Sequence, residues 1–371
     1  MKNIAGTPQI IKLVNQNSIE GFIRTQGPIT KPELAKLTKL SLVTVNKTVE
    51  TLLAEGRVEI SGMNESTGGR CAQYFVANKN FCCYIILYYD ELQYVGVIAN
   101  AVGEIIYETI FNVRVDVYDE VMEDTFHAID ALIAQCGGKQ IEAIGIGIPG
   151  IIENNILIDI GKIPSWNGVD IAKIISDKYQ LKVFLENDIN LATIGLYYDG
   201  FQRNVHSLAL VFLDHNVGGG LIVNGELYKG SSNFVGEMAC MPVCAVDLES
   251  GQRQLRKETL EDRILYLYER FNNAKPEEKQ ELKTELINVI ADVLTYIVCI
   301  INPEAIVLAC CLLDGSDINT IRGILAERIV LKSIPRIVNS NGMRKNGVAG
   351  MIAFCIRESI PVYALSSKNS D

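Results

Sequence analysis

The sequence lacks any apolar run of the roughly 18 residues that a membrane-spanning helix requires. Its first residues, MKNIAGTPQIIK, also lack the apolar core and the small-residue cleavage site of a secretory signal peptide. We therefore expect a cytoplasmic protein with no membrane partner. At 371 residues the chain is long enough for two or three domains, and its 48% hydrophobic and 21% charged residues are typical of globular proteins.

The ten cysteines do not indicate a disulfide framework. Six of them lie inside apolar runs, where a reduced cysteine behaves as a small hydrophobic side chain. These six are Cys82, Cys83, Cys299, Cys310, Cys311 and Cys355. Because no export signal is present, we expect the thiols to stay reduced.

Charge is unevenly distributed along the chain. Residues 1–79 hold ten Lys and Arg against six Asp and Glu, a net charge of +4, whereas the remainder holds 24 against 38, a net charge of −14. A basic segment attached to an acidic body indicates that only the first segment meets a polyanion such as DNA. The same charge of +4 is also compatible with an ordinary solvated surface.

Residues 1–79 have the pattern of a small helical domain. Apolar residues at helical spacing predict a first helix over 8–25, which Gly27-Pro28 ends. Thr30-Lys31-Pro32-Glu33 is a capping box that opens a second, short helix. After a tight turn, Ser41 caps a third helix that ends at Gly56, and this arrangement matches a helix-turn-helix. The second helix is expected to bury Leu34, Ala35 and Leu37.

A β-hairpin is predicted after the third helix. Strand-like runs at 57–60 and 72–76 flank the glycine-rich loop 64–70, which is typical of the wing in a winged helix-turn-helix. The third helix would then enter the major groove, where Thr and Asn meet base edges and Lys meets phosphates. The predicted DNA-binding residues are Ser41, Val43, Thr44, Asn46, Lys47 and, at the wing tip, Arg70. The alternative is a small helical cap with a polar face.

Residues 80–371 alternate strands and helices, a pattern that predicts an α/β fold. The strand-like runs are 84–89, 94–99, 104–113, 141–148, 207–213, 219–223 and 305–308, and the helical segments include 118–135 and 282–301. Glu186-Asn187-Asp188 follows a further strand-like run. These polar residues stand at the carboxyl end of a strand, where open α/β sheets bind their ligands.

Six motifs of the body, taken in their order along the chain, give the sequence a specific resemblance. They are GIGIPG at 145–150, PSWNG at 164–168, ENDIN at 186–190, GGGLIVNG at 218–225, FVGE at 234–237 and NPEAIVL at 302–308. In this order they resemble the ROK family (repressors, open reading frames and kinases). The first segment resembles that of the family's repressor branch, including TGGR at 67–70.

The resemblance implies the domain organisation. An α+β winged helix-turn-helix is expected over residues 1–79. An α/β domain with the actin/hexokinase-like, ribonuclease H-like fold of two lobes is expected over residues 80–371, where it would bind an effector and hold the oligomer together.

The resemblance also implies the residues of a sugar site. In the family's kinases, the residue that matches Asp188 is the base that accepts the proton of the sugar hydroxyl. The residues that match Asn187 and Glu237 form hydrogen bonds with the sugar. We therefore expect a sugar at Asn187, Asp188 and Glu237. From the residues alone, an Asn-Asp pair at a strand end is equally an ordinary turn.

The phosphate-binding loops of the family's kinases are missing. Their Asp-x-Gly-Gly-Thr turn aligns with 88–92, which has no glycine and carries Asp90 and Glu91. The second loop reads DHNVG at 214–218, which adds Asp214, and Cys310-Cys311 replaces the adenine-side Gly-Gly. Because carboxylates repel a polyphosphate, the resemblance implies no ATP cofactor, no kinase activity, and Asp188 as a vestigial base.

The zinc site of the family is also incomplete. Cys240 stands at the position of its histidine, and the cysteine-rich run that supplies the other ligands is missing. Cys240 and Cys244 alone cannot form a closed site of four ligands, so no metal is expected.

These features predict a DNA-binding transcriptional regulator, a repressor of carbohydrate-related genes, whose degenerate kinase-like domain binds a sugar effector. A homodimer or higher homo-oligomer on an inverted-repeat operator is expected, because helix-turn-helix dimers read two half-sites. Two alternatives stay open. One is an active ROK sugar kinase with an accessory DNA-binding head; the other is a regulator controlled by a protein partner or by thiol chemistry, with a vestigial sugar pocket.

Overall fold

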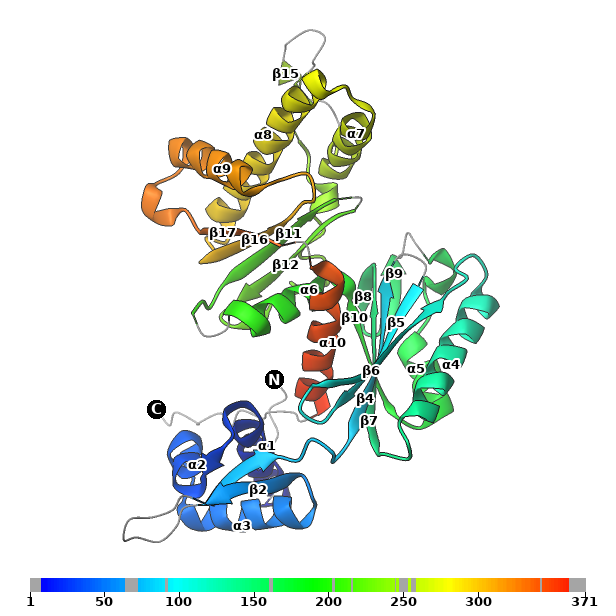
Figure 1. Cartoon of the computed structure of the whole chain (residues 1–371), viewed down its shortest axis with the longest axis vertical. Coiled ribbons are helices and arrows are strands. Elements are labelled where there is room, and N and C mark those ends of the chain that lie inside the picture. Colours follow the sequence, from blue (N-terminus) through cyan, green and yellow to red (C-terminus); the bar gives the residue numbers. More distant parts are fainter. Residues whose placement is uncertain are drawn as a thin grey trace.

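The computed structural model shows a head and two lobes stacked along the long axis of the molecule (Figure 1). The head comprises residues 8–77. Lobe 1 comprises residues 83–187 together with the last helix, and lobe 2 comprises residues 188–339. The structure describes residues 8–63, 73–90, 93–159, 163–201, 204–214, 216–243, 245–246, 253–254, 258–340 and 342–359.

The head is a winged helix-turn-helix, as the sequence predicted. Its elements are α1 (Pro8–Gln26), β1 (Ile29–Thr30), α2 (Lys31–Thr38), α3 (Leu42–Ala54), β2 (Val58–Met63) and β3 (Gln73–Ala77). Thr30 and Glu33 form the expected capping box of α2, and the Ser41 side chain caps α3 by accepting from the Thr44 N–H. The antiparallel β2–β3 hairpin is the wing. The wing-tip residue Arg70 lies outside the described residues.

The core of the head joins one side chain or more from every helix. Its buried members include Ile19, Ile23, Leu34, Val45, Val49, Leu52 and Phe75. The prediction that Leu37 is buried was wrong, since 39% of it is exposed. The left-handed conformation of Lys39 turns the chain after α2, and Leu40 packs against the core instead.

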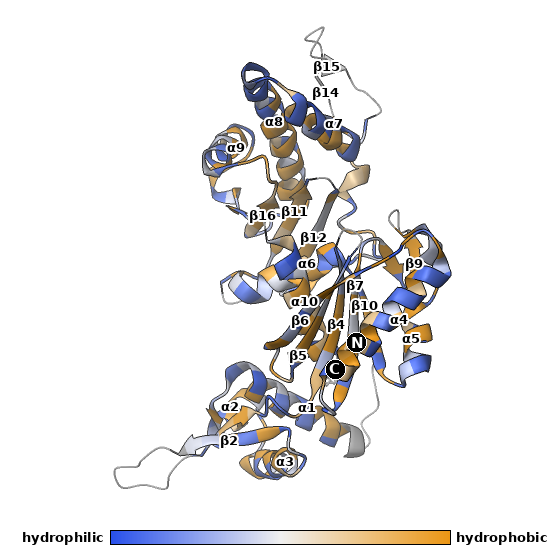
Figure 2. Ribbon diagram, turned by 45° about the vertical axis from the view of Figure 1, so that its right-hand side comes forward, coloured by the Kyte–Doolittle hydropathy of each residue, from blue (hydrophilic) through white to orange (hydrophobic). Residues whose placement is uncertain are grey.

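Lobe 1 is a five-stranded sheet with helices on both faces. Its elements are β4 (Cys83–Asp90), β5 (Gln93–Asn100), β6 (Ile105–Asn112), α4 (Tyr118–Gln135), β7 (Ile141–Ile148), β8 (Ile151–Glu153), β9 (Ile156–Asp159), α5 (Ile171–Tyr179), β10 (Lys182–Asn187) and α10 (Met343–Ser359). β4, β7 and β10 run parallel, so their carboxyl ends meet at one edge. Figure 2 shows that these strands are largely hydrophobic, as expected for strands covered on both faces.

Lobe 2 is built around a second five-stranded sheet. Its elements are α6 (Asp188–Leu196), β11 (Leu208–Leu213), β12 (Val217–Val223), β13 (Glu226–Leu227), β14 (Ala245–Val246), β15 (Arg253–Gln254), α7 (Leu260–Asn273), α8 (Pro276–Ile300), β16 (Ala305–Ala309), α9 (Gly315–Arg328) and β17 (Arg336–Asn339). Helices α7, α8 and α9 bury one face of this sheet. No described helix combines the length and the apolar content that crossing a bilayer requires.

The two sheets repeat one topology. The strand order is β10-β7-β4-β5-β6 in lobe 1 and β17-β16-β11-β12-β13 in lobe 2. In each sheet the first strand in the chain pairs antiparallel with the second and parallel with a later one. This pair of matching lobes is the actin/hexokinase-like fold that the sequence predicted.

Helices α6 and α10 cross in close contact between the two sheets (Figure 1). A Cβ atom on Gly350 of α10 would lie 1.8 Å from the backbone oxygen of Leu191, and one on Gly195 of α6 would lie 2.0 Å from that of Asn346. The two backbones therefore touch, and neither glycine has room for a side chain.

We predict that Gly350→Ala destabilises the body, because overpacking costs about 1–3 kcal/mol and the obstructing atoms belong to a backbone. For a domain of this size, that loss lowers Tm by roughly 2–10 °C. The matched control is Gly323→Ala in α9, where a Cβ meets nothing within 4 Å. The control should raise Tm slightly, since Ala is the better helix former by about 1 kcal/mol. Equal melting temperatures for both variants in a calorimetric scan would contradict the close contact.

Candidate functional site

A polar cavity, here called cavity A, lies between the lobes where the carboxyl end of β10 meets the amino end of α6. Its volume is about 330 Å³. The three residues that the sequence placed at a sugar site, Asn187, Asp188 and Glu237, all line it. Asn187 and Asp188 come from the β10–α6 junction, whereas Glu237 comes from the loop before a short 3-10 helix, Met238–Cys240.

The β10–α6 junction holds Asn187 in a fixed position. Its side-chain oxygen caps α6 by accepting from the Asn190 N–H at 2.9 Å, and its Nδ2 donates to the Gly150 carbonyl at 3.0 Å. Asp188 is the first residue of α6, and its carboxylate accepts from the Ile189 N–H at 2.9 Å. The Tyr88 hydroxyl donates to the Asp188 carbonyl at 3.5 Å. A carboxylate in the first turn is also favoured by the helix dipole.

Two further polar residues line cavity A that sequence reasoning did not identify. Glu261 lies in the first turn of α7, which a Thr259–Asp262 capping box starts. Asn233 has a positive φ of 56° and donates through Nδ2 to the carbonyl of Ile152. The capping box could have located the start of α7, but nothing local in the sequence indicates that this helix begins at the cavity.

An ion pair with a buried carboxylate joins the lobes at the edge of cavity A. The carboxylate of Glu186, at the end of β10, pairs with Lys229 of lobe 2. Glu186 also accepts from the Asn190 side chain at 3.1 Å and from the Asn187 N–H at 3.0 Å. A charge this deeply buried is tolerated only when it is paired in this way. The pair and the Asn233–Ile152 contact therefore tie the segment that carries Glu237 to lobe 1.

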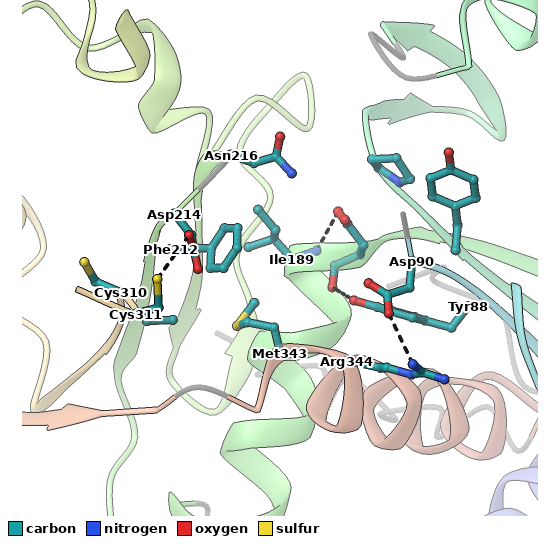
Figure 3. A pocket seen from close by; sticks show the side chains of 14 residues that line it. Tyr88, Asp90, Ile189, Phe212, Asp214, Asn216, Cys310, Cys311, Met343 and Arg344 are labelled. Carbon is teal, nitrogen blue, oxygen red and sulfur yellow. Dashed lines mark hydrogen bonds and ion pairs between the residues drawn. The ribbon is translucent and has the colours of Figure 1, made fainter. Parts of the chain in front are cut away.

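A second cavity, cavity B, adjoins cavity A and has a volume of about 260 Å³ (Figure 3). Both cavities are lined by Asp188, Ile189 and Phe212. Cavity B is further lined by side chains from the ends of β4, β11 and β16 and from the start of α10. They include Tyr88, Asp90, Asp214, Cys310, Cys311 and Arg344.

The lining of cavity B is rich in carboxylates. Asp90, Asp188 and Asp214 contribute three, against the single guanidinium of Arg344 among the described lining residues. Arg344 lies 3.6 Å from Asp90, so its charge is already paired. Two like charges 4 Å apart repel by about 4 kcal/mol at an effective dielectric near 20. Cavity B therefore disfavours an anionic ligand.

Sulfur atoms occupy the side of cavity B formed by β16. The Cys311 thiol donates to Asp214 at 3.5 Å, and the Tyr268 hydroxyl lies 3.6 Å from the sulfur of Cys310 and 3.4 Å from that of Cys311. Burial raises the pKa of Cys310 to about 11, so this thiol stays protonated at neutral pH. Burial in the core was expected for all six cysteines named from the sequence. Cys299 and Cys311 are instead exposed, because they lie in the last turn of α8 and in the turn after β16.

The described part of the chain gathers no group of three or more His, Cys, Asp or Glu side chains that could hold a metal ion. Cys240 is exposed and lines cavity A. Cys244, the second cysteine of that pair, lies outside the described residues, as does His215.

The head presents the amino-terminal half of α3 to solvent. Val43 is 78% exposed and Lys47 is exposed, while Thr44 and Asn46 are half-buried. The hydroxyl of Ser41 lies 2.9 Å from that of Thr44 and accepts from its N–H, so it serves the helix cap. Val43, Thr44 and Lys47 also line a groove between α3 and α1, to which α1 adds a second basic side chain, Lys12.

A family profile and individual relatives both relate this chain to known proteins. The sequence profile of the ROK family matches residues 94–358. The xylose repressor of Bacillus subtilis (strain 168) is 30% identical over 239 residues, which cover 63% of this chain and 61% of the repressor. The N-acetylglucosamine repressor of Escherichia coli O157:H7 is 23% identical over 258 residues, 64% of this chain and 59% of that protein. The matches thus span less than two thirds of these relatives.

Solved structures share the fold. A ROK family transcriptional regulator, described as a homologue of the Escherichia coli MLC protein, superposes with a TM-score of 0.75 at 16% identity over 93% of this chain and 97% of its own. A ROK family glucokinase from Streptomyces griseus, solved with glucose and AMPPNP, gives a TM-score of 0.57 at 17% identity. It covers 73% of this chain and 98% of the glucokinase. The regulator therefore matches head and body, whereas the kinase matches a share the size of the body.

Proposed function

The chain belongs to the ROK family, and from this premise we propose that it is a DNA-binding transcriptional repressor of carbohydrate-related genes that a sugar controls. The observation that carries the proposal is the union in one chain of a winged helix-turn-helix head and a two-lobed body with a polar cavity between its lobes. Relatives named for xylose and for N-acetylglucosamine support a sugar as the effector.

DNA binding is assigned to the domain of residues 1–79, and within it to Ser41, Val43, Thr44, Asn46, Lys47 and Arg70. The amino-terminal half of α3 combines a basic side chain with polar ones and with Val43, whose methyl groups suit a thymine methyl. A homodimer held together by the body would place two heads on the half-sites of an inverted repeat, about 34–36 Å or a multiple of this distance apart.

Lys47→Ala should weaken operator binding and reduce its salt dependence, because each Lys–phosphate contact releases a counterion. We expect the slope of log affinity against log salt to fall by about one unit for each head. Lys332→Ala, an exposed lysine of lobe 2, is the matched control and should leave both quantities unchanged. Fluorescence anisotropy over a salt series measures them. Identical slopes for the two variants would remove α3 from the DNA interface.

The effector is assigned to cavity A, with Asn187, Asp188 and Glu237 as its hydrogen-bonding partners. The cavity volume falls in the range of about 300–1,000 Å³ that is common for small-molecule sites. Carboxylates accept hydrogen bonds from sugar hydroxyls, and the Asn side chain can donate as well as accept. Glu186 and Glu261 bring two further carboxylates to the same cavity.

Asp188→Ala should abolish the effect of the sugar on operator affinity while leaving sugar-free binding nearly intact. In the wild type, effector and operator must change each other's affinity by one factor, commonly about 5- to 150-fold. The measurement is operator affinity with and without saturating D-xylose or N-acetyl-D-glucosamine. Asp177→Ala, on the exposed face of α5, is the control. A full response in Asp188→Ala would mean that the sugar binds elsewhere, whereas no response in the wild type would favour control by a protein partner or by thiol chemistry.

We propose further that the chain does not transfer phosphate. The carboxylates of cavity B disfavour a polyphosphate, and the paired Arg344 has no uncompensated charge to offer it. We therefore expect no heat on titration with Mg-ATP and no sugar phosphate after incubation with ATP and either sugar. Phosphorylation of a sugar would instead establish the alternative of an active sugar kinase with an accessory head.

A further inference from the structure

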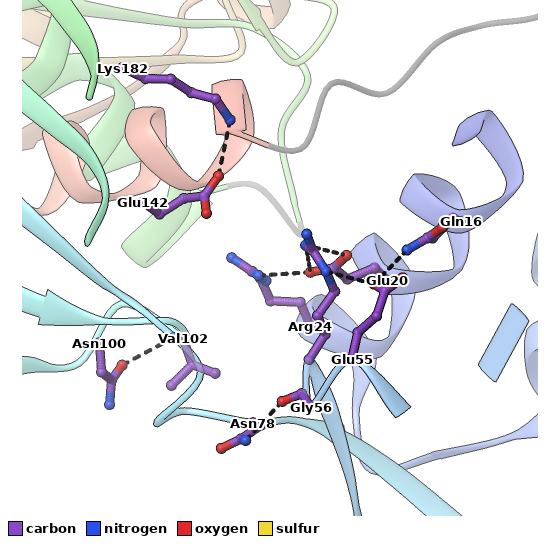
Figure 4. A network of polar contacts seen from close by, with 11 residues as sticks. Gln16, Glu20, Arg24, Glu55, Gly56, Asn78, Asn100, Val102, Glu142 and Lys182 are labelled. Carbon is purple, nitrogen blue, oxygen red and sulfur yellow. Dashed lines mark hydrogen bonds and ion pairs between the residues drawn. The ribbon is translucent and has the colours of Figure 1, made fainter. Parts of the chain in front are cut away.

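A buried carboxylate, Glu20, organises the contact of the head with lobe 1. It lies on α1 and is 2% exposed. Its two oxygens pair with Arg24 of α1 and with Arg57 at the start of the wing, each at 3.2 Å. Arg57 also pairs with Glu55 at 3.0 Å, and the Gln16 side chain donates to the Glu55 carboxylate at 3.0 Å (Figure 4). Glu20 therefore fixes two guanidinium groups in defined positions.

Both arginines lie near the segment that connects the head to lobe 1. The Arg57 guanidinium lies 5.0 Å from the ring centroid of Phe81, within the range of a cation–π interaction. Arg24 is close enough to Tyr84, the second residue of β4, to lower the pKa of its hydroxyl, although burial raises that pKa overall to about 12. The charge of Glu142 of β7 helps to raise the pKa of Arg57, and Glu142 binds Lys182 of β10 at 3.0 Å.

The connecting segment, residues 78–82, is itself held by the head. The Asn78 N–H donates to the Arg57 carbonyl at 2.9 Å, and its side chain donates to the Gly56 carbonyl at 2.8 Å. The N–H groups of Asn80 and Phe81 in turn bind Asn78. Because this segment connects the head to lobe 1 in sequence, its hydrogen bonds help to fix the direction in which the head points.

β4 follows the connecting segment at its amino end and, with its parallel neighbours β7 and β10, reaches the two cavities at its carboxyl end. β4 runs from Tyr84 to Tyr88 and Asp90, and β10 runs from Lys182 to Asn187. β7 lies between them, with Glu142 near one end and Pro149 just beyond the other. A strand of eight residues spans about 26 Å. Because these parallel strands are hydrogen-bonded to one another, they move as one body. A rotation of lobe 1 at the cavities therefore also moves the strand ends nearest the head.

We propose that the Glu20–Arg24–Arg57 cluster is the joint that makes the head move with lobe 1. This inference rests on the proposed function and adds to it the positioning residues of the switch. When a sugar draws the lobes together, lobe 1 turns relative to lobe 2, and the joint converts that rotation into a new head position. With the joint broken, the head pivots on residues 78–82, and lobe closure no longer changes operator affinity.

Glu20→Gln tests the joint, because it removes the charge and preserves the shape. The control is Glu59→Gln, the same chemical change at an exposed position of β2. We expect Glu20→Gln to keep sugar affinity and sugar-free operator affinity within about 2-fold of wild type. The 5- to 150-fold effect of saturating D-xylose or N-acetyl-D-glucosamine on operator affinity should fall to about 1-fold. A sugar response in Glu20→Gln equal to that of wild type and Glu59→Gln would overturn the proposal.

Amide hydrogen exchange gives a second readout that needs neither sugar nor DNA. The amide of Asn78 should exchange at least about 10-fold faster in Glu20→Gln, since its acceptor is the Arg57 carbonyl and local opening sets the exchange rate. An unchanged exchange rate of the Asn78 amide in Glu20→Gln would overturn the proposal of a joint. If the wild type fails to bind operator or to respond to sugar, the proposed function fails, and this readout alone decides whether the joint exists.

A second variant covers the case in which Glu20→Gln does not fold. Phe81→Leu removes the ring under Arg57 from outside the head, so the head core is untouched. It should reduce the sugar effect on operator affinity several-fold and speed exchange at Asn78. Wild-type values for both quantities in Phe81→Leu would overturn the proposal.

Discussion

The contact between α6 and α10 is the constraint on which the rest of the structure depends. Gly195 and Gly350 let the two backbones touch, and the pair stands between the two sheets. Each helix also begins at a cavity: α6 starts with Asp188 at cavity A, and α10 starts with Met343 and Arg344 at cavity B. The positions of Asp188, Met343 and Arg344 at the cavities are therefore set by this helix crossing. Close-packed interfaces of this kind have discrete arrangements and do not deform continuously.

The two cavities differ in chemistry although they share a wall. Both use the end of a strand and the start of a helix, and Asp188 belongs to both linings. In cavity A the charge of Glu186 is satisfied by Lys229 and by neighbouring amides, and the carboxylates of Asp188, Glu237 and Glu261 line the same cavity. In cavity B the sole described guanidinium pairs with Asp90, and a thiol binds Asp214.

Local signals in the sequence were sufficient for much of this architecture. The capping box at Thr30, the cap at Ser41 and the glycine-rich wing located the head, because each acts within a few residues of the chain. Polar residues after the β10 run located one side of cavity A. Glu261 was missed, since its approach to the cavity depends on how α7 packs on lobe 2. Cys311 was misjudged because an apolar neighbourhood in sequence does not reveal that the strand has already ended.

The Glu20 cluster was invisible to the same reasoning because Arg57 is 37 residues away from Glu20 in sequence and lies outside α1. Its chemistry also runs against simple stability. A buried carboxylate between two arginines gains little over apolar packing, because desolvation offsets most of the attraction. The ion pairs contribute a defined orientation. Guanidinium groups bind carboxylates with a fixed geometry, whereas aliphatic side chains can shift past one another at little cost. An apolar contact of equal area would keep the head attached to lobe 1 but would leave its orientation loosely set. A head that must report a rotation of lobe 1 needs its orientation fixed, and the ion pairs of the buried Glu20 with Arg24 and Arg57 supply that constraint.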